Sequence, residues 1–390
     1  MVLHSRSRLS FPACILALIL LALYFRSHPD LVTIRNAGSE MQPTQDESKP
    51  AGTQPNRPIA ITHPKYQAGI PKPAGQNYSR TVVIASTSKE DTTWLAHLAN
   101  EPNLATAVYV VDDPNSPLTV PKNKGHEVMV YLTYIIDNYD QLSDIIMFMH
   151  AHQITWHNND LIFSDAVEMV RRLSSQKVTR DGYMNMRCHL DPGCPDHIHP
   201  STDDDHGGNV PEAVVIGRAW IELFPDAEAP PRVLSQPCCA QFALSKARIQ
   251  NLPLDRYVAF RKWLLDTELD DRLSGRVWEY VWQYVFAGVE EFCPIESVCY
   301  CDGYGVCFGG EDSYQEWFAM RKKSRELAEV KESLGEDENV AEQKLQIQVE
   351  LTELDLKMST QKKDAFLRGD HPNSRAVEAG RDWKEGDGFQ

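Results

Sequence analysis

The feature that most constrains this chain is a single apolar run close to its amino terminus. The run extends from Leu9 to Phe25, seventeen residues, with arginines at positions 6, 8 and 26. That length is at the short end of what a membrane-spanning helix requires, and its last residues are too bulky for a signal-peptidase site. We therefore expect an uncleaved signal anchor, with a cleaved signal or a buried core helix as alternatives. The flanking arginines would hold residues 1–8 in the cytosol and direct the rest of the chain into a lumen.

The next segment, residues 26–79, has the composition of a flexible stalk. From Ser27 to Ser79 it contains eight prolines and four glycines, so it cannot bury enough apolar surface to offset the entropy cost of ordering. The chain's only N-glycosylation sequon is Asn77-Tyr78-Ser79, and a luminal position would make Asn77 a glycan acceptor. A span this short suits the thin membranes of the early secretory pathway. We expect a single-pass protein of the Golgi or endoplasmic reticulum, or alternatively a secreted one.

Charge and aromatic content narrow the class of protein further. Lysine and arginine total 39 against 55 aspartate and glutamate, a net charge of −16. This balance argues against nucleic acid as a partner, because the phosphate backbone needs a basic surface. The 8 tryptophans, 14 tyrosines and 13 phenylalanines supply ample material for a folded core. We therefore expect a folded luminal domain rather than a disordered chain.

Cysteine usage agrees with an oxidising compartment. Apart from Cys14 in the apolar run, eight cysteines lie between residues 188 and 307, and an even set indicates up to four disulfides. Adjacent cysteines are strained as partners of each other, so we expect Cys238 and Cys239 to pair elsewhere. A zinc site is the alternative for the last four, although they lack paired Cys-x-x-Cys spacing. The eight candidates are Cys188, Cys194, Cys238, Cys239, Cys293, Cys299, Cys301 and Cys307.

Between residues 80 and 310, apolar runs of strand length alternate with helical periods. The run from Asp144 to His150 is apolar between its ends, which is typical of a strand covered on both faces. The alternation predicts an α/β fold with a mostly parallel sheet and helices on both faces. The expected strands are 81–85, 107–111, 144–150 and 241–245, and the expected helices are 90–100, 127–137, 164–173 and 276–286.

The remainder, residues 311–390, is a charged extension without cysteine. Ile347, Leu351, Leu354 and Met358 recur at the spacing of a coiled-coil seam. A second helix is expected over 313–334, and the residues from about 376 look disordered. A helical hairpin, modest self-association and a solvated helix are all compatible with this pattern.

Two polar strand ends mark where chemistry is expected, because open parallel sheets bind ligands beyond the carboxyl ends of their strands. One is Asp112-Asp113, and the other is His150-Ala151-His152, followed by Trp156-His157. Residues two apart in an extended chain face the same side, so His150 and His152 are candidate metal ligands, with His157 returning from the loop. Neutral histidines that close loop hydrogen bonds are the alternative. The acidic stretch from Asp196 to Gly208 is either a solvated loop or a cation site.

A further candidate lies on the predicted helix 276–286. Its apolar stripe of Trp278, Val281 and Trp282 is expected to be core. Glu279 lies beside the stripe, where desolvation would let its carboxylate act as a general base; a surface ion pair with Arg276 is the alternative. The chain has no nucleophile elbow, P-loop or dinucleotide motif, so those enzyme classes lose their sequence support.

Three separated stretches, residues 123–158, 238–249 and 274–288, resemble a fungal family defined by a domain of unknown function, numbered three-four-three-one. The resemblance covers about residues 81–310 and implies no established activity. The block QFALSKARI (241–249), followed by a helix with an acidic residue and paired aromatics, is similar to the acceptor half of single-domain nucleotide-sugar glycosyltransferases of the Golgi. That similarity implies a glycosyltransferase A-like domain.

The glycosyltransferase similarity also implies site roles. Glu279 would be the catalytic base, and a divalent ion, Mn²⁺ or Mg²⁺, would lie near Asp112 or near His150 and His152. Such transferases usually have Asp-x-Asp after a central strand, whereas this strand ends in His150-Ala151-His152. The expected substrate contacts are Asp112, Asp113, Trp156, His157 and Gln241.

The resulting hypothesis is a luminal transferase that acts on glycans or glycoconjugates. Its alternatives are a non-catalytic luminal binding or scaffold protein that associates through its C-terminal helices, and a histidine-centred metallohydrolase.

Overall fold

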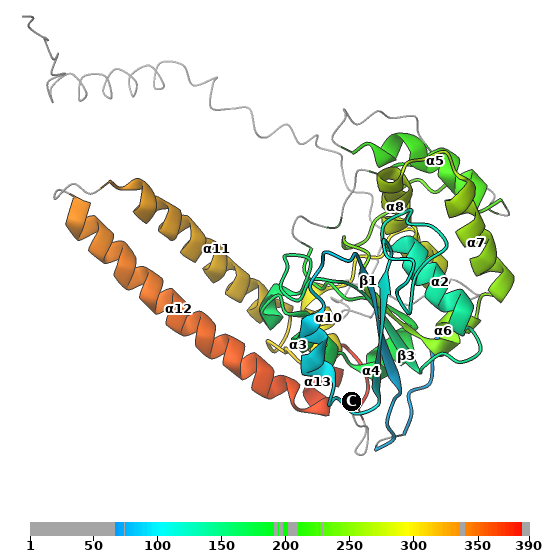
Figure 1. Ribbon diagram of the computed structural model, residues 1–390. Helices are drawn as coiled ribbons and strands as arrows, with labels where there is room; N and C mark the ends of the chain where they lie inside the picture. Colours follow the sequence, from blue (N-terminus) through cyan, green and yellow to red (C-terminus); the bar gives the residue numbers. More distant parts are fainter. Residues whose placement is uncertain are drawn as a thin grey trace, which may run out of the picture. The chain divides into compact units, whose positions relative to one another are not determined.

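The structure is a computed structural model that describes residues 67–73, 75–190, 194, 198–201, 210–225, 227, 229–335 and 340–383 (Figure 1). All of them belong to the second of two units of the chain, Pro55–Gln390. The expected anchor at 9–25, most of the stalk and the acidic run 202–209 lie outside the described residues. Among the residues described, no helix combines the length and the apolar character needed to cross a bilayer.

A mixed five-stranded sheet forms the centre of the domain, in the order β2-β1-β3-β5-β4. β1 pairs in parallel with β2 and β3, whereas β5 lies antiparallel between β3 and β4. The α/β class is confirmed. Four of the five strands run in the same direction, as expected of a mostly parallel sheet, and β5 alone runs in the opposite direction. The strands are β1 (Arg80–Ser86), β2 (Leu104–Val110), β3 (Ile145–His150), β4 (Tyr183–Asn185) and β5 (Phe242–Ser245).

Helices cover both faces of the sheet, as expected (Figure 1). Successive residues of β3 alternate between two buried clusters, with Phe148 in one and Met147 in the other, which explains why the strand is apolar throughout. The Phe148 face packs against α2 (Val128–Asn138), α5 (Glu212–Leu223), α6 (Lys246–Gln250), α7 (Leu254–Asp266), α8 (Asp271–Glu279) and α9 (Trp282–Ala287). The Met147 face packs against η2 (Thr93–Leu98), η3 (Asp160–Ile162), α3 (Ala166–Arg172), α4 (Ser175–Asp181) and α10 (Glu296–Tyr304).

The single helix expected over 276–286 is two helices. α8 ends at Glu279, and α9 begins at Trp282 after two non-helical residues. The apolar stripe is core as expected, because Trp278, Val281 and Trp282 are fully buried. The break leaves the Glu279 side chain at the end of a helix rather than on the side of a continuous one.

Part of the expected stalk is packed against the domain. The Lys72 ammonium lies 2.7 Å from the Asp144 carboxylate, and the Gly69 amide donates to the Arg180 carbonyl at 2.9 Å. Tyr78 is buried. Residues 67–73 and 75–79 are thus held to the domain by contacts with α4 and with the residue before β3.

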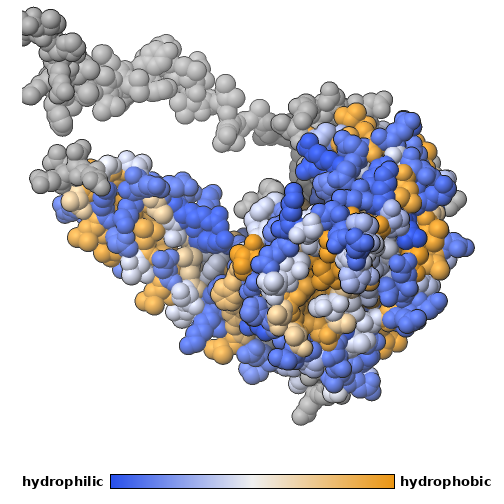
Figure 2. Space-filling view, in the orientation of Figure 1, coloured by the Kyte–Doolittle hydropathy of each residue, from blue (hydrophilic) through white to orange (hydrophobic). Residues whose placement is uncertain are grey.

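The C-terminal extension forms the helical hairpin that was one of its expected alternatives. α11 (Glu311–Ser333) and α12 (Ala341–Gly369) run side by side, with Ile347 of the seam buried between them. Near the domain, the Trp317 indole donates to the Met358 carbonyl at 3.0 Å, and Arg321 pairs with Asp160. Farther along α12, apolar side chains reach the surface (Figure 2), among them Leu345, Val349 and Leu356.

The residues after the hairpin are more ordered than expected. α13 (Pro372–Glu378) packs against α10, and its Ala376 is fully buried. The expectation of disorder from about residue 376 is therefore wrong for residues up to 383. A close backbone approach explains the docking, because a Cβ on Gly369 would lie 2.0 Å from the Gly305 carbonyl oxygen.

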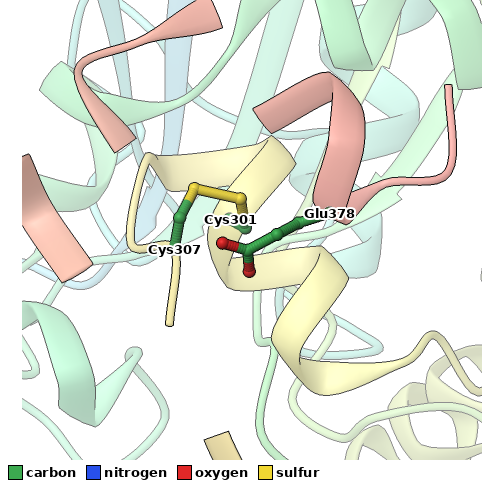
Figure 3. Close-up of side chains that lie close together, drawn as sticks. All are labelled: Cys301, Cys307 and Glu378. Atoms are coloured by element: carbon green, nitrogen blue, oxygen red, sulfur yellow. A yellow bond between two sulfur atoms is a disulfide. The ribbon is translucent and has the colours of Figure 1, made fainter. Parts of the chain in front are cut away.

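All eight candidate cysteines are disulfide-bonded, as Cys188–Cys299, Cys194–Cys293, Cys238–Cys239 and Cys301–Cys307. The expectation that Cys238 and Cys239 pair elsewhere is wrong. The backbone at Cys239 and Ala240 is left-handed, with φ of 87° and 46°, and this turn allows neighbouring side chains to meet. Figure 3 shows Cys301–Cys307 beside the Glu378 carboxyl group of α13.

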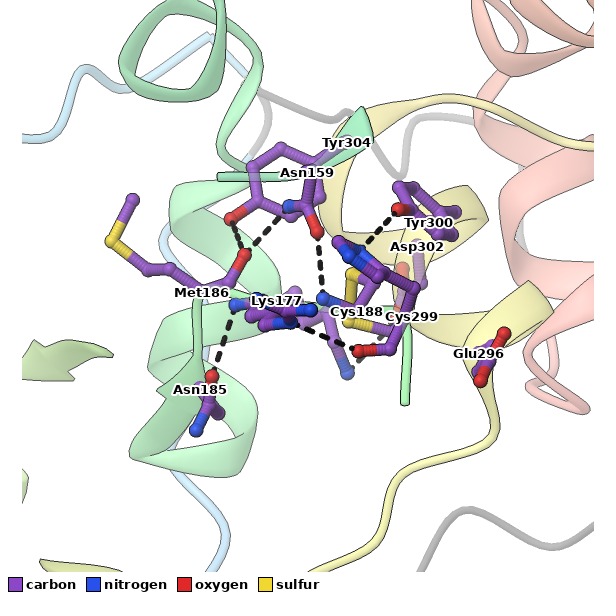
Figure 4. The surroundings of a disulfide bond; sticks show 12 residues. Asn159, Lys177, Asn185, Met186, Cys188, Glu296, Cys299, Tyr300, Asp302 and Tyr304 are labelled. Atoms are coloured by element: carbon purple, nitrogen blue, oxygen red, sulfur yellow. Dashed lines mark hydrogen bonds and ion pairs between the residues drawn. A yellow bond between two sulfur atoms is a disulfide. The ribbon is translucent and has the colours of Figure 1, made fainter. Parts of the chain in front are cut away.

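The Cys188–Cys299 disulfide joins the strand region to α10 inside the core (Figure 4). The Asn159 side chain makes two hydrogen bonds beside this disulfide. Its Nδ2 atom donates to the Met186 carbonyl at 2.6 Å, and its Oδ1 atom accepts from the Cys188 backbone amide at 2.7 Å. The Tyr304 hydroxyl donates to the same Met186 carbonyl at 2.7 Å. Covalent and hydrogen-bonded links therefore hold α10 against the Met147 face.

Candidate functional site

The carboxyl ends of β1, β2 and β3 meet at one edge of the sheet. The chain leaves β1 to form β2 on one side and later β3 on the other, so the gap between β1 and β3 is a topological switch point. Open α/β sheets bind ligands at such points. Both strand ends singled out in the sequence, Asp112-Asp113 and His150-Ala151-His152, lie at this edge.

His150 forms a partly buried pair with His157. Their Nδ1 atoms are 3.1 Å apart, and the His150 Nε2 atom is buried with no hydrogen-bond partner among the described residues. Burial, followed by the charges of His157, His152 and His126, lowers the pKa of His150 to about 3. Burial and the nearby Arg187 also lower the pKa of His157. The pair is therefore neutral at physiological pH, and the loop histidine does return to the strand end as expected.

His152 points away from this pair toward the loop after β1. Its Nε2 atom lies 3.8 Å from Glu90 Oε1. Glu90 itself accepts from the Thr87 amide at 2.7 Å. The strand ends at His150, so the extended geometry that would align His150 with His152 is lost one residue later. These two histidines therefore have different partners.

Asp112 and Asp113 are engaged in loop hydrogen bonds. The Asp112 carboxylate accepts from the Ser88 amide at 2.7 Å and from its hydroxyl at 2.8 Å, and these bonds lower the pKa of Asp112. Asp113 accepts from the Asn115 amide at 2.9 Å. Asp112 thus fastens the β1 loop to the end of β2.

A tight turn before α2 brings a second carboxyl group to Glu279. Gly125 and His126 have left-handed φ of 74° and 51°, and a Cβ on Gly275 of α8 would lie 3.2 Å from the Gly125 carbonyl and the His126 ring. Because α8 can approach this closely only at a glycine, Glu127 and Glu279 are held near each other. The His126 ring pairs with Asp271 at 3.2 Å.

The two carboxyl groups share a desolvated environment. Burial raises the pKa of Glu279 to about 7; Arg276 opposes this shift and Glu212 adds to it. Burial, with the added charges of Glu279 and Asp271, raises the pKa of Glu127 to about 8. Two coupled carboxyls titrate as a pair, so near neutral pH the pair keeps about one proton.

Tyr131 and Glu212 lie near the two carboxyl groups, and Tyr131 is counted with them below. The Tyr131 hydroxyl is buried without a hydrogen-bond partner among the described residues, and burial with the charges of Glu127 and Glu279 raises its pKa well above the usual value. Glu212 is 1% exposed and accepts from Arg276 at 3.0 Å. The expected Arg276 ion pair is thus made with Glu212. We define Glu127, Glu279 and Tyr131 as the carboxyl cluster.

Trp156 supplies an exposed aromatic surface at the same edge. Its side chain is 62% exposed, its ring lies 4.2 Å from that of His157, and the Arg187 guanidinium lies 5.0 Å from the ring centre. The Arg187 Nη1 atom donates to the Trp156 carbonyl at 3.0 Å and contacts Cys239 Sγ at 3.6 Å. The Cys238–Cys239 turn therefore lies behind the aromatic surface.

Gln241, expected to contact substrate, is 1% exposed. Its carbonyl accepts from the His150 amide at 3.1 Å, and its amide donates to the Asn158 carbonyl at 3.0 Å. Both ends of the side chain are committed to the protein. Gln241 therefore positions the end of β3 and the following loop.

The residues described here do not fit the expected Mn²⁺ or Mg²⁺. These ions prefer several carboxylate oxygens, but both Asp112 oxygens accept hydrogen bonds from Ser88. The one group of three potential ligands among the described residues is Cys301, Cys307 and Glu378. Its two sulfurs form a disulfide and are not thiolates. This donor set also gives no support to a zinc site or a histidine-centred metallohydrolase.

Sequence reasoning missed Glu127, Tyr131, His126 and Arg187. A Gly-His-Glu sequence directly before a helix is the signal that marks the turn. The partner of Glu127 is Glu279, which is too far away in the sequence for a local pattern to indicate it. Asn77 is exposed at the other end of β1. The site residues Trp156, His157, His150 and Glu279 lie around the predicted edge.

Comparison with known proteins gives one match. No curated protein and no solved structure matches the chain. A family model described as "Protein of unknown function (DUF3431)" matches residues 82–302, which include β2 to β5, all of β1 but its first two residues, and α2 through α9. The chain therefore belongs to the DUF3431 family.

Proposed function

We propose that the protein is a luminal transferase that moves a sugar from a nucleotide donor to a hydroxyl of a glycan or glycoconjugate. This proposal rests on the Glu279 carboxyl group, which belongs to the carboxyl cluster beside the switch point. Burial raises the pKa of Glu279 to about 7. A base whose pKa lies near the working pH is the most effective in proton transfer.

In this proposal the described residues have separate roles. Glu279 removes the proton of the acceptor hydroxyl. Glu127 has the higher pKa, so it keeps its proton and can donate a hydrogen bond to the bound substrate. The exposed Trp156 ring offers a stacking face for a sugar. The neutral His150–His157 pair and Gln241 fix the loop that presents Trp156. No step of this scheme uses a metal ion.

Two features support a glycosyltransferase-like role and a luminal location. The block from Gln241 to Ile249 forms β5 and α6, and it packs against α9, the helix that follows the one bearing Glu279. This order of elements is consistent with the similarity to Golgi transferases. The four disulfides favour an oxidising compartment. We propose that the apolar run 9–25 anchors the protein in the Golgi or endoplasmic reticulum membrane and that the domain faces the lumen.

The proposal is tested with the secreted luminal part, residues 27–390. It is incubated with a panel of UDP- and GDP-sugars, with Mn²⁺ and separately with EDTA, and release of the nucleoside diphosphate is measured with and without glycan acceptors. Acceptor-stimulated release with at least one donor is the expected result. No turnover and no donor binding across the panel would refute the transferase.

A second candidate is a scaffold that self-associates through the hairpin. Leu345, Val349 and Leu356 are 65%, 52% and 70% exposed and lie four and seven residues apart, on one face of α12 (Figure 2). Such a stripe suits a helical bundle formed with a second copy of the chain.

For this candidate, Leu345→Glu with Leu356→Glu is expected to convert a dimer or larger species to a monomer in sedimentation velocity. A Gln346→Glu variant, at an exposed polar position of the same helix, should leave the assembly unchanged. A wild-type protein that sediments as a monomer at micromolar concentrations would rule out the scaffold.

A further inference from the structure

A cavity of about 440 Å³ lies at the opposite edge of the sheet, where the parallel strands begin. Four segments far apart in sequence line it: the start of β1, the residue before β2, the end of α3 and α13. Its lining includes Arg80, Arg171, Arg172 and Arg375 and no aspartate or glutamate. Because the whole chain has a net charge of −16, four guanidinium groups around one cavity form a local reversal of charge.

Neighbouring carboxylates neutralise only part of this charge. Arg171 pairs with Glu101 at 2.8 Å and with Glu168 at 3.4 Å, and Arg172 pairs with the same Glu168 at 3.2 Å. Asp302 and Asp370 also act on Arg375, and Asp302 pairs with Arg180 and Arg381 as well. Glu101 and Glu168 thus pair with Arg171 and Arg172, and no carboxylate of a described residue lines the cavity itself.

Arg80 is the least compensated member of this group. Its Nη1 atom donates to the Val170 carbonyl at 3.2 Å, and it forms no ion pair among the described residues. Burial lowers the pKa of Arg80, and Glu101 opposes this shift only in part. A guanidinium group has five N–H donors, and Arg80, which lines the cavity, has one hydrogen bond to a protein acceptor among the described residues. A partly buried cation without a paired carboxylate is stabilised by a bound anion.

The rest of the lining is suited to an oxyanion with a polar substituent. Asn77, Asn103, Ser174 and Ser175 add amide and hydroxyl groups, and Tyr78 and Leu173 add limited apolar surface. The volume exceeds that of an inorganic anion and falls in the range of small-molecule sites. The planar guanidinium group of arginine can donate two parallel hydrogen bonds to two oxygens of a phosphate or sulfate group.

We propose that this arginine cavity binds a tetrahedral oxyanion, the phosphate or sulfate ester group of a small molecule. The site is separate from the carboxyl cluster, and the inference does not depend on the proposed function. It also requires the C-terminal segment, because Arg375 belongs to α13 and is 8% exposed.

The test uses the luminal part at pH 7 and constant ionic strength. Inorganic phosphate, inorganic sulfate, hexose 6-phosphate and chloride are titrated, and binding is followed by calorimetry and by the thermal unfolding midpoint. Saturable binding of phosphate or sulfate with a higher midpoint is expected, and chloride should have no such effect. Comparing the affinities for phosphate and sulfate shows whether the site prefers a phosphate ester or a sulfate ester. Tighter binding of hexose 6-phosphate than of inorganic phosphate would support a ligand larger than the anion. The same titration after enzymatic deglycosylation prevents a glycan on Asn77, at the rim, from blocking access.

Arg80→Gln is expected to weaken phosphate or sulfate binding at least about tenfold, since a hydrogen-bonded charge is lost. Arg172→Gln is a second variant, at a more exposed position, and should weaken binding even if Arg80→Gln folds poorly. Arg218→Gln on α5, where the side chain is 82% exposed, is the matched control and should bind as wild type. No saturable binding by wild type, or equal affinity in all three variants, would overturn the proposal.

Discussion

Replacing Glu279 with glutamine is expected to lower transfer activity by about 10²- to 10⁴-fold, the usual contribution of a general base. Glutamine keeps the shape of the side chain but cannot take a proton from an acceptor. In the wild type, kcat/KM should rise with pH around the Glu279 pKa of about 7, because only the deprotonated carboxylate acts as the base. The measurement is a pH profile of initial rates for both proteins with the donor found in the panel.

Two controls separate a catalytic effect from a structural one. Glu222→Gln removes a carboxylate that pairs with Arg218 and Trp263 outside the site, and should leave the rate unchanged. Glu127→Gln should keep the rise near pH 7, because Glu127 is still protonated when Glu279 ionises. If Glu279→Gln folds and retains full activity, Glu279 is not the base.

Removing the Cys188–Cys299 disulfide is expected to cost about 3 kcal/mol of unfolding free energy. The two cysteines are 111 residues apart, but the Cys194–Cys293 disulfide remains inside this span, so the loop that Cys188–Cys299 closes contains about 14 residues, 188–194 and 293–299, and its cross-link lowers the entropy of the unfolded chain accordingly. This loss is a sizeable share of the about 5–15 kcal/mol stability of a typical domain. Urea unfolding of Cys188→Ala with Cys299→Ala, compared with wild type under non-reducing conditions, measures it.

The Cys301–Cys307 disulfide is the internal comparison. Its cysteines are 6 residues apart, so the same reasoning gives about 2 kcal/mol for Cys301→Ala with Cys307→Ala. Both pairs end on α10 and its flanking loop, so the two double variants differ mainly in loop length. A clearly larger loss for Cys301 and Cys307 would contradict the loop-length argument, and no loss for Cys188 and Cys299 would mean that they are not bonded in the native protein.

The central strands were predictable because burial on both faces leaves a simple apolar run. The expected strands 81–85, 107–111 and 144–150 lie within three residues of β1, β2 and β3. Strand direction was not predictable for β5, because an apolar run has no polarity. β4 is three residues long, too short for any period to appear. The two residues between α8 and α9, Tyr280 and Val281, are neither glycine nor proline, so the local sequence does not predict that the helix breaks there.

The candidate site was predictable only in part. Trp156, His157 and Glu279 were identified because polar strand ends and an acidic residue beside paired tryptophans are local patterns. Glu127 was missed because an acidic residue at a helix start is ordinarily a favourable, solvated one. Its raised pKa arises from burial and from the charge of Glu279, 152 positions away, and the Gly125–Gly275 contact that brings them together is encoded by no local pattern.

The place of β5 in the sheet has a consequence for the synthesis of the protein. β3 pairs on one side with β1, but its other neighbour is β5, which begins at Phe242. At about 5–20 residues per second, the ribosome needs on the order of 5–20 s after His150 before that neighbour is complete. Throughout this interval an apolar strand has an open hydrogen-bonding edge, which is a template for aggregation. Newly made chains should therefore depend on a chaperone that binds this exposed strand during this part of translation.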